Sequence, residues 1–444
     1  MVSRPHVIGP PSQHAEPIDS PTNSTADEDK RLADKFAAHR HLVPLVSQDP
    51  SVLFLNAASA PPSNLIVHEA IARYSAQALY DPAPHAGWRE TREEARRLVA
   101  RCINAEDDGA TTIAFTRDTT EALGTFIRCV RFRPGDNVVV VDAEHPNQTL
   151  CWLALRGSAG LEVRQVPTIP EAGPGPGSGK DRIEPVTAET LRPYVDSRTR
   201  AIGISSMTFD AGQRNDVRGI CAAYRARGIQ VLADATQQVG FARLDVRALG
   251  VSAAAFSLHK GLNAPTGLGA LYVSPAALRE LGDPVPPVVS MEGVANLDQS
   301  LVVRVRGDDD EPLELRPGAR RFEHANVSLV AVAAAAAFTR FYLDVLGPAD
   351  VEAHLYGLTE GLGRECDRLG IRVVSPRERG ERAPHIAVLA LPREWGDYFR
   401  GPGGARVTMN RLGARVSFGF YNSVEDVRRF VRVLELGIAQ GLGI

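Results

Sequence analysis

Residues 252–274 read SAAAFSLHKGLNAPTGLGALYVS, and this stretch is the starting point for interpreting the rest of the chain. An apolar run that predicts a buried strand leads to Lys260, and a glycine-rich turn follows it. The chain has only four lysines among its 50 lysines and arginines, and an arginine cannot lose its proton near neutral pH. Desolvation lowers the pKa of a lysine held among apolar groups, which makes its amine a nucleophile suited to Schiff-base chemistry. The alternative is that Lys260 caps a strand end and extends into solvent.

A second apolar strand ends at Asp234, in the segment GIQVLADATQQVG (228–240). A buried carboxylate there suits the protonated ring nitrogen that lets pyridoxal 5′-phosphate (PLP) act as an electron sink. Three segments, DATQ (234–237), SLHK (257–260) and PTGLG (265–269), stand in an order and at a spacing that resemble the class V aminotransferase family of fold-type I PLP enzymes. That family includes cysteine desulfurases and isopenicillin N epimerase-like proteins.

Strand-like and helix-like patterns alternate between residues 110 and 275, which predicts an α/β fold with a mostly parallel sheet. The resemblance implies a sheet of the seven-stranded type. We expect a flexible tail over residues 1–48, a large PLP-binding domain over 49–330 and a smaller C-terminal α+β domain over 331–444. The first segment of the large domain is a candidate to join the small one. The Gly/Pro-rich segment 171–182 is expected to be a surface insertion.

Bulk composition excludes several classes of function. The net charge is −3 with both signs mixed, which gives no reason to expect nucleic acid or a membrane as a partner. The five cysteines are scattered and predict neither a metal site nor a disulfide framework. The sequence shows no signal-peptide pattern and no uninterrupted run of about 18 apolar residues. We therefore expect a cytoplasmic protein with a small-molecule substrate.

The resemblance implies a set of cofactor contacts. RDTTEA (117–122) joins a strand to a helix; by itself it fits a capped helix start as well as an anion site. The family pattern assigns the phosphate to Thr119, Thr120, Ser257 and His259. It places His145, in DAEHPNQ, against the cofactor ring as a stacking and acid/base group, and Gln237 on the phenolic oxygen. Asn326, in RFEHANVS (321–328), would reach the partner's phosphate across a homodimer interface.

Substrate contacts are implied in the same way. Arg415, in RVSFGFYN (415–422), matches the arginine that binds the substrate α-carboxylate, for which a guanidinium fork is suited. Asn56 and Ser59, in LNAASAPPSN (55–64), and His85, in DPAPHAGW (81–88), are further candidates, although plain turn roles fit these residues equally well. No cysteine lies between Asp367 and Arg415, where desulfurases carry their nucleophile, so a persulfide-forming desulfurase is not expected.

Several reactions are compatible with this set of residues. LNAASAPPSN is similar to loline-pathway-type enzymes of secondary metabolism, which implies decarboxylation coupled to a Mannich-type ring closure. A Cβ–S lyase and an amino-acid epimerase are the alternatives, and a non-catalytic PLP-fold scaffold or regulator is the alternative from another class. In each enzymatic case Lys260 would carry the cofactor and move a proton. Carboxylate binding by Arg415 would favour loss of the Cα–H bond over decarboxylation.

Overall fold

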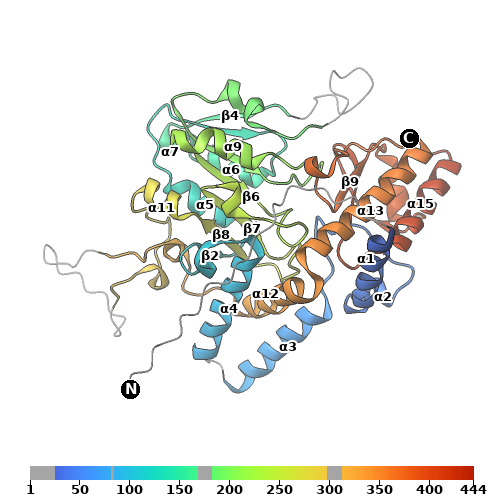
Figure 1. Ribbon diagram of the computed structural model, residues 1–444, viewed down its shortest axis with the longest axis horizontal. Helices are drawn as coiled ribbons and strands as arrows, with labels where there is room; N and C mark the ends of the chain where they lie inside the picture. The colour runs from blue at the N-terminus through green and yellow to red at the C-terminus, as the bar shows by residue number, and fades with distance from the viewer. Residues whose placement is uncertain (1–25, 82–84, 169–182, 298–312) are drawn as a thin grey trace, which may run out of the picture.

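A seven-stranded sheet forms the centre of the large domain in the computed structural model, which describes residues 26–81, 85–168, 183–297 and 313–444 (Figure 1). Its strand order is β2-β8-β7-β6-β5-β3-β4. β8 runs antiparallel to β2 and β7, and every other neighbouring pair is parallel. The strands are β2 (Ile113–Thr116), β3 (Asn137–Val141), β4 (Glu162–Val166), β5 (Thr199–Ser205), β6 (Gln230–Asp234), β7 (Ala253–Ser257) and β8 (Gly269–Val273). The α/β fold predicted from the alternating pattern is therefore confirmed.

The central strands are buried on both faces, which explains their continuous apolar sequences. In β7, Ala253 and Ala255 pack with α5 and α6, while Ala254 and Phe256 belong to the core on the other side, which includes α9 and α12. This alternation follows from the two-residue period of a strand. The helices of the large domain are α3 (Leu65–Tyr80), α4 (His85–Ile103), α5 (Thr119–Cys129), α6 (Pro146–Leu153), α7 (Arg156–Ala159), α8 (Ala188–Leu191), α9 (Val217–Tyr224), α10 (Val246–Leu249), α11 (Pro275–Leu281) and α12 (Leu329–Phe341).

The C-terminal domain is built on an antiparallel sheet of order β11-β12-β9. Its elements are α13 (Pro348–Leu369), β9 (Ile386–Leu389), α14 (Glu394–Arg400), β10 (Ala405–Arg406), β11 (Thr408–Asn410), β12 (Gly413–Ser417) and α15 (Val424–Ala439). The apolar segment IRVVSP (371–376) adds only a single bridge, between Val373 and Leu389. The α+β character predicted for this part of the chain is present.

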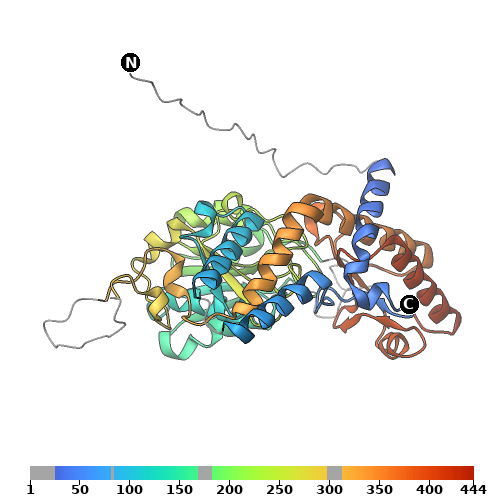
Figure 2. The same ribbon diagram turned by 90° about the horizontal axis from the view of Figure 1, so that it is seen from below.

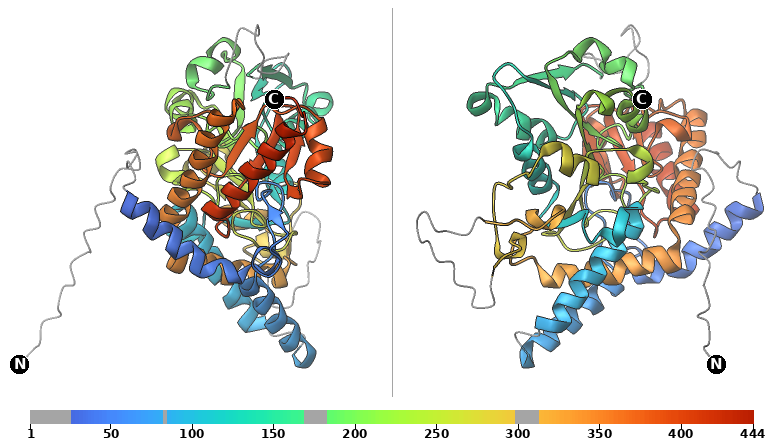
Figure 3. Two further views of the ribbon diagram at one scale, coloured as in Figure 1. Left: turned by 90° about the vertical axis from the view of Figure 1, so that its right-hand side faces the viewer. Right: turned by 60° about the vertical axis from the view of Figure 1, so that its left-hand side comes forward.

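The segment expected to be a flexible tail up to residue 48 is folded from residue 26 onward, which corrects that boundary. It forms α1 (Ala26–His39) and α2 (Pro44–Ser47), and α1 packs against α13 (Figures 2 and 3). Leu32 and Phe36, four residues apart on one helix face, are buried at 3% and 1% exposure. β1 (Leu53–Phe54) then pairs in parallel with β10, so this segment belongs with the C-terminal domain. Residues 1–25 and the insertion 171–182 lie outside the described residues.

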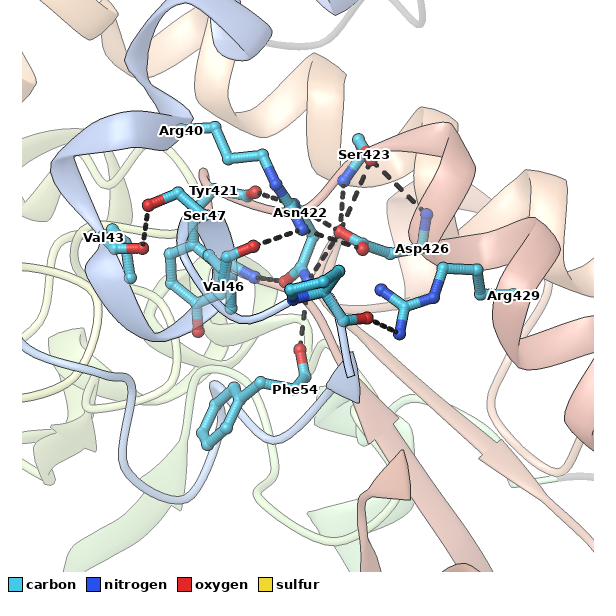
Figure 4. Close-up of polar contacts among 12 residues, drawn as sticks. Arg40, Val43, Val46, Ser47, Phe54, Tyr421, Asn422, Ser423, Asp426 and Arg429 are labelled. Atoms are coloured by element: carbon cyan, nitrogen blue, oxygen red, sulfur yellow. Dashed lines mark hydrogen bonds and ion pairs between the residues drawn. The ribbon is translucent and has the colours of Figure 1, made fainter. Parts of the chain in front are cut away.

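Polar contacts fasten the N-terminal segment to the start of α15 (Figure 4). The Arg40 guanidinium donates to both carboxylate oxygens of Asp426, at 2.6 and 3.0 Å, and also to the carbonyl oxygens of Tyr421 and Val46. Asn422 Nδ2 donates to the carbonyl oxygen of Phe54 at 3.0 Å. The Asp426 side chain is only 4% exposed, so its charge depends on these donors.

We expect Asp426→Asn to destabilise this junction by about 2–4 kcal/mol, because it leaves a largely buried guanidinium without its counter-charge. Thermal and urea unfolding would measure the change. Glu425→Gln in the same helix turn is the matched control. Glu425 pairs with the exposed Arg428 and Arg432, so its substitution should change stability by less than about 1 kcal/mol. Equal effects of the two substitutions would contradict the assignment.

Among the described residues, one helical stretch, Leu329–Leu346, is long and apolar enough to cross a membrane, with a mean hydropathy of 1.7 over 18 residues. It spans α12 and a following turn of π-helix (Tyr342–Leu346). α12 packs against α3 and α4, and its residues Ala331, Val332 and Phe338 belong to the main core. A buried core helix meets the same criterion of length and composition.

Candidate active site

A cavity of about 230 Å³ opens where the strands of the large sheet reach their carboxyl ends, the usual ligand position in such folds. Residues that directly follow β2, β3, β5, β6 and β7 line it. They are Asp118, Thr119, Thr120, His145, Asn147, Ser205, Met207, Phe209, Asp234, Thr236, Gln237, Ser257, His259 and Lys260. Eight residues predicted from the sequence therefore meet in one place: Thr119, Thr120, His145, Asp234, Gln237, Ser257, His259 and Lys260.

Lys260 lies in the connection between β7 and β8, and hydrogen bonds close this connection on both sides. Leu258 N donates to Leu268 O at 3.1 Å, and Asn263 N donates to Lys260 O at 2.9 Å. The backbone also passes against another loop, because a Cβ on Gly261 would lie 2.3 Å from Val239 O. Only glycine permits that approach. The main chain that carries the lysine is thus fixed.

The surroundings of Lys260 favour its neutral form. Burial lowers the pKa of this amine to about 8; the negative Asp234 opposes that change and the positive Arg415 adds to it. Asp234 ends β6 and is 7% exposed. One of its carboxylate oxygens accepts from Thr236 N at 2.9 Å, and the other has no hydrogen-bond donor among the described residues. A ring N–H of a bound molecule could fill that position.

Three hydroxyls gather at the N-terminus of α5. Thr119 Oγ1 lies 2.8 Å from Thr236 Oγ1 and 2.7 Å from Ser257 Oγ, and Ser257 Oγ also accepts from Thr119 N at 3.1 Å. Thr120 Oγ1 accepts from Asn147 Nδ2 at 2.6 Å. Hydroxyls at the positive end of a helix dipole suit a phosphate. The capped-helix interpretation also holds, because the Asp118 carboxylate accepts from Glu121 N at 2.8 Å.

His145 caps α6, and its ring lies beside the cavity. Nδ1 accepts from Asn147 N at 3.3 Å, which leaves the proton of the neutral ring on Nε2. The ring meets Phe209 edge to face at a centroid distance of 5.1 Å. Burial lowers the pKa of His145, an effect that Asp234 opposes. A neutral imidazole with a fixed tautomer results.

Arg415 lies on β12 of the small domain and is 5% exposed; it does not line the cavity, but its positive charge acts on Lys260. Its Nη1 donates to Phe209 O at 2.5 Å, whereas its buried Nε has no hydrogen-bond partner within the described part of the chain. Burial lowers the pKa of this guanidinium to about 10, although the nearby Asp210 favours the charged form. An unpartnered donor on a buried cation is costly unless an anion joins it.

The other predicted residues lie in different surroundings. Asn56 accepts from Thr408 Oγ1 at 2.8 Å and its backbone bridges Ser417, while Ser59 is exposed in the following turn; neither lines the cavity. Their turn contributes instead through Ala58 O, which accepts from Gln237 Nε2 at 2.9 Å. Asn326 is exposed and does not line the cavity. His85 begins α4, and its side chain lies outside the described residues.

Several lining residues were not singled out from the sequence. Thr236 and Asn147 each follow a predicted residue by two positions. Their position just after the end of a strand could have identified them as cavity residues. Glu144 is buried behind the cavity, where Ser205 donates to both of its oxygens. The pKa of Glu144 is raised to about 8, mainly by burial; the hydrogen bonds from Ser205 oppose the change, and the negative Asp234 and Asp210 add to it. No motif or periodicity around Glu144 indicated this burial.

This fold and this site define a PLP-dependent enzyme class. The Aminotransferase class-V family model matches residues 52–367, and the chain belongs to that family, whose cofactor is PLP. An uncharacterized aminotransferase of Schizosaccharomyces pombe is 41% identical over 405 residues, covering 91% of this chain and 96% of the relative. A probable cysteine desulfurase of Methanothermobacter thermautotrophicus is 30% identical and covers 86% of this chain and 94% of its own.

Solved structures share the fold at low sequence identity. The apo cysteine desulfurase of Thermococcus onnurineus NA1 has a TM-score of 0.75 at 21% identity, covering 91% of this chain and 98% of its own. A C-DES variant with glycine covalently linked to the PLP cofactor also has a TM-score of 0.75, at 19% identity, covering 91% of this chain and 99% of that chain. The fold-type I assignment made from the sequence is confirmed.

The residues present fit PLP. The hydroxyl cluster on α5 can take the phosphate, and the free Asp234 oxygen can take the ring nitrogen. Lys260 supplies the amine, with its pKa lowered.

We expect apoenzyme to capture PLP covalently at a rate that rises with pH up to about 8 and then levels off. The neutral amine is the nucleophile, and a lysine with a lowered pKa reaches its neutral form at a lower pH. Stopped-flow absorbance between pH 6.5 and 9.5 would measure the rate. N-acetyl-lysine amide, with an ordinary pKa of about 10.4, is the control and should keep gaining rate throughout that range. An identical pH dependence for the protein would contradict the lowered pKa.

Proposed function

We propose that this enzyme binds an α-amino acid by its carboxylate at Arg415 and breaks the Cα–H bond. The observation that carries the proposal is the buried guanidinium of Arg415, whose Nε lacks a partner. A carboxylate would supply the missing acceptor and the counter-charge in one step. A carboxylate held in this way is retained in the product, so the proposal favours lyase, aminotransferase or epimerase chemistry.

Proton transfer is assigned to Lys260. Its pKa of about 8 lets the amine both accept and return a proton near neutral pH. Bound PLP would supply the electron sink, with Asp234 on its ring nitrogen and Thr119, Thr120 and Ser257 around its phosphate. His145, which lines the cavity with its proton on Nε2, would stack on the ring and donate to substrate.

A desulfurase mechanism through a cysteine persulfide has less support. A nucleophilic cysteine needs exposure and a lowered pKa. Cys102, Cys129, Cys221 and Cys366 are buried, and burial raises the pKa of each thiol. Cys151 is half-buried in α6, and burial raises the pKa of its thiol too.

Decarboxylation coupled to ring closure, the expectation from the LNAASAPPSN resemblance, becomes the competing outcome. The distinguishing experiment incubates the holoenzyme with a panel of α-deuterated amino acids, and follows loss of the label by NMR and release of carbon dioxide. We expect label loss with the carboxylate retained. Carbon dioxide release without label loss would overturn the proposal in favour of decarboxylation. Neither event with any amino acid, in protein that has bound PLP, would favour a non-catalytic scaffold.

The homodimer and the cytoplasmic location stay predictions. The exposure of Asn326 outside its own cavity supports a role across an interface, since a residue that serves a partner's cofactor must leave its own subunit. Light scattering of the purified protein would test the dimer.

A further inference from the structure

His385 directly precedes β9 and is completely buried beside the cofactor cavity. Its imidazole stacks on Phe241 with ring centroids 3.8 Å apart and planes 4° from parallel. Its carbonyl oxygen accepts from Phe418 N at 2.9 Å. The small domain therefore presents a ring to the large domain in one fixed orientation.

The hydrogen bonds of Gln237 decide which atom of each group carries a proton. The Gln237 amide lies between Ala58 O, at 2.9 Å, and His385 Nε2, at 3.2 Å. A carbonyl oxygen only accepts, so the NH2 group of Gln237 must face Ala58 and its oxygen must face His385. The amide oxygen also only accepts, so His385 Nε2 must carry the proton. The buried His385 Nδ1 has no partner among the residues that the structure describes, which agrees with an unprotonated nitrogen there.

One N–H of Gln237 is then left for the cavity. The NH2 group has two hydrogens, and Ala58 O accepts one of them. Gln237 lines the cavity together with Asp234 and Lys260. Flipping the amide would place its oxygen against Ala58 O, and no tautomer of His385 relieves that contact between two acceptors. The two neighbours thus fix the orientation of the amide and leave one N–H of a cavity-lining residue available to a ligand.

We infer that His385 is a positioning residue that holds the Gln237 amide as a hydrogen-bond donor to the cofactor's phenolic oxygen. This inference rests on the PLP site described above and does not depend on which bond of the substrate is broken. The ring also stays neutral, because burial and the positive charges of Arg415 and Lys260 hold the pKa of His385 well below its ordinary value. A neutral ring keeps a single proton, and the bond to Gln237 requires that proton on Nε2.

The test is a double-mutant cycle read by cofactor binding and absorbance, with no substrate present. His385→Phe keeps an aromatic ring against Phe241 but removes the N–H. We expect it to raise the dissociation constant of PLP from apoenzyme about tenfold, because a hydrogen bond to a charged group is weakened. The Gln237 N–H stabilises the ionised phenolic oxygen. In His385→Phe this donor is no longer held in place, so the pH midpoint of the visible band should rise by about one pH unit. In a Gln237→Leu background the same change should have no further effect.

Two more variants keep the test decisive if His385→Phe is poorly folded, which thermal unfolding of the apoenzyme would show. His385→Gln retains an N–H donor and should stay within about threefold of the unsubstituted protein. Phe241→Leu removes the stacking ring but no hydrogen-bonding group, and should weaken PLP binding about threefold, again only when Gln237 is present. Additive effects in the Gln237→Leu background, or a His385→Phe protein with unchanged affinity and band, would overturn the inference. Failure of the proposed reaction would leave these binding results unaffected.

Discussion

Lys260→Ala is expected to lower turnover by at least about 10³-fold and to remove the visible band that borohydride bleaches in the unsubstituted protein. The substitution deletes both the amine that joins the cofactor and the base that moves the substrate proton. Lys260→Arg is the matched variant, because it preserves the positive charge beside Asp234 but cannot become a neutral nucleophile. Absorbance spectra with and without borohydride, together with product formation, would measure both.

We expect both Lys260 variants to lose the borohydride-sensitive band and product formation to the same extent. An active Lys260→Arg protein would mean that the lysine acts only through its charge. A visible band that survives in Lys260→Ala and is still bleached by borohydride would place the covalent link on another residue.

Arg415→Gln is expected to reduce kcat/KM for the amino-acid substrate by about 10²-fold, since removing one partner of a buried charge pair costs about 2–5 kcal/mol. Arg428→Gln, on the exposed face of α15, is the control and should leave kcat/KM within about twofold. The sharper measurement compares the amino acid with the amine that lacks its carboxylate. The unsubstituted enzyme should prefer the amino acid, and Arg415→Gln should lose most of that preference. An unchanged preference would contradict carboxylate binding at this residue.

The sequence was sufficient for the large sheet because its strands are buried on both faces. A run such as NVVVV in β3 predicts a buried strand from its residue types alone. Since parallel strands present their carboxyl ends at one edge, polar residues after successive strands could be expected to meet there, as His145, Asp234 and Lys260 do.

Contacts between distant segments were beyond such reasoning. The register of β1 on β10 and the burial of α1 depend on surfaces that only the folded C-terminal domain creates. His385 shows the same limit at the site, because in HIAVLAL it reads as the start of a strand. His385 matters at the site because its Nε2 contacts the Gln237 side-chain oxygen. Neither periodicity nor motif spacing predicts that contact.

The pairing of the N-terminal segment with the C-terminal domain has a consequence for biosynthesis. Asn56 and its partner Thr408 are separated by 352 positions, so a ribosome adding about 5–20 residues per second needs about 20 to 70 s between them. Until β10 and β12 have been made, Leu53 and Leu55 lack the strands that later bury them, so these apolar side chains stay exposed once they leave the ribosome. Ala58 reaches Gln237 only once its own segment is seated, so the cofactor would be loaded after synthesis has passed β12.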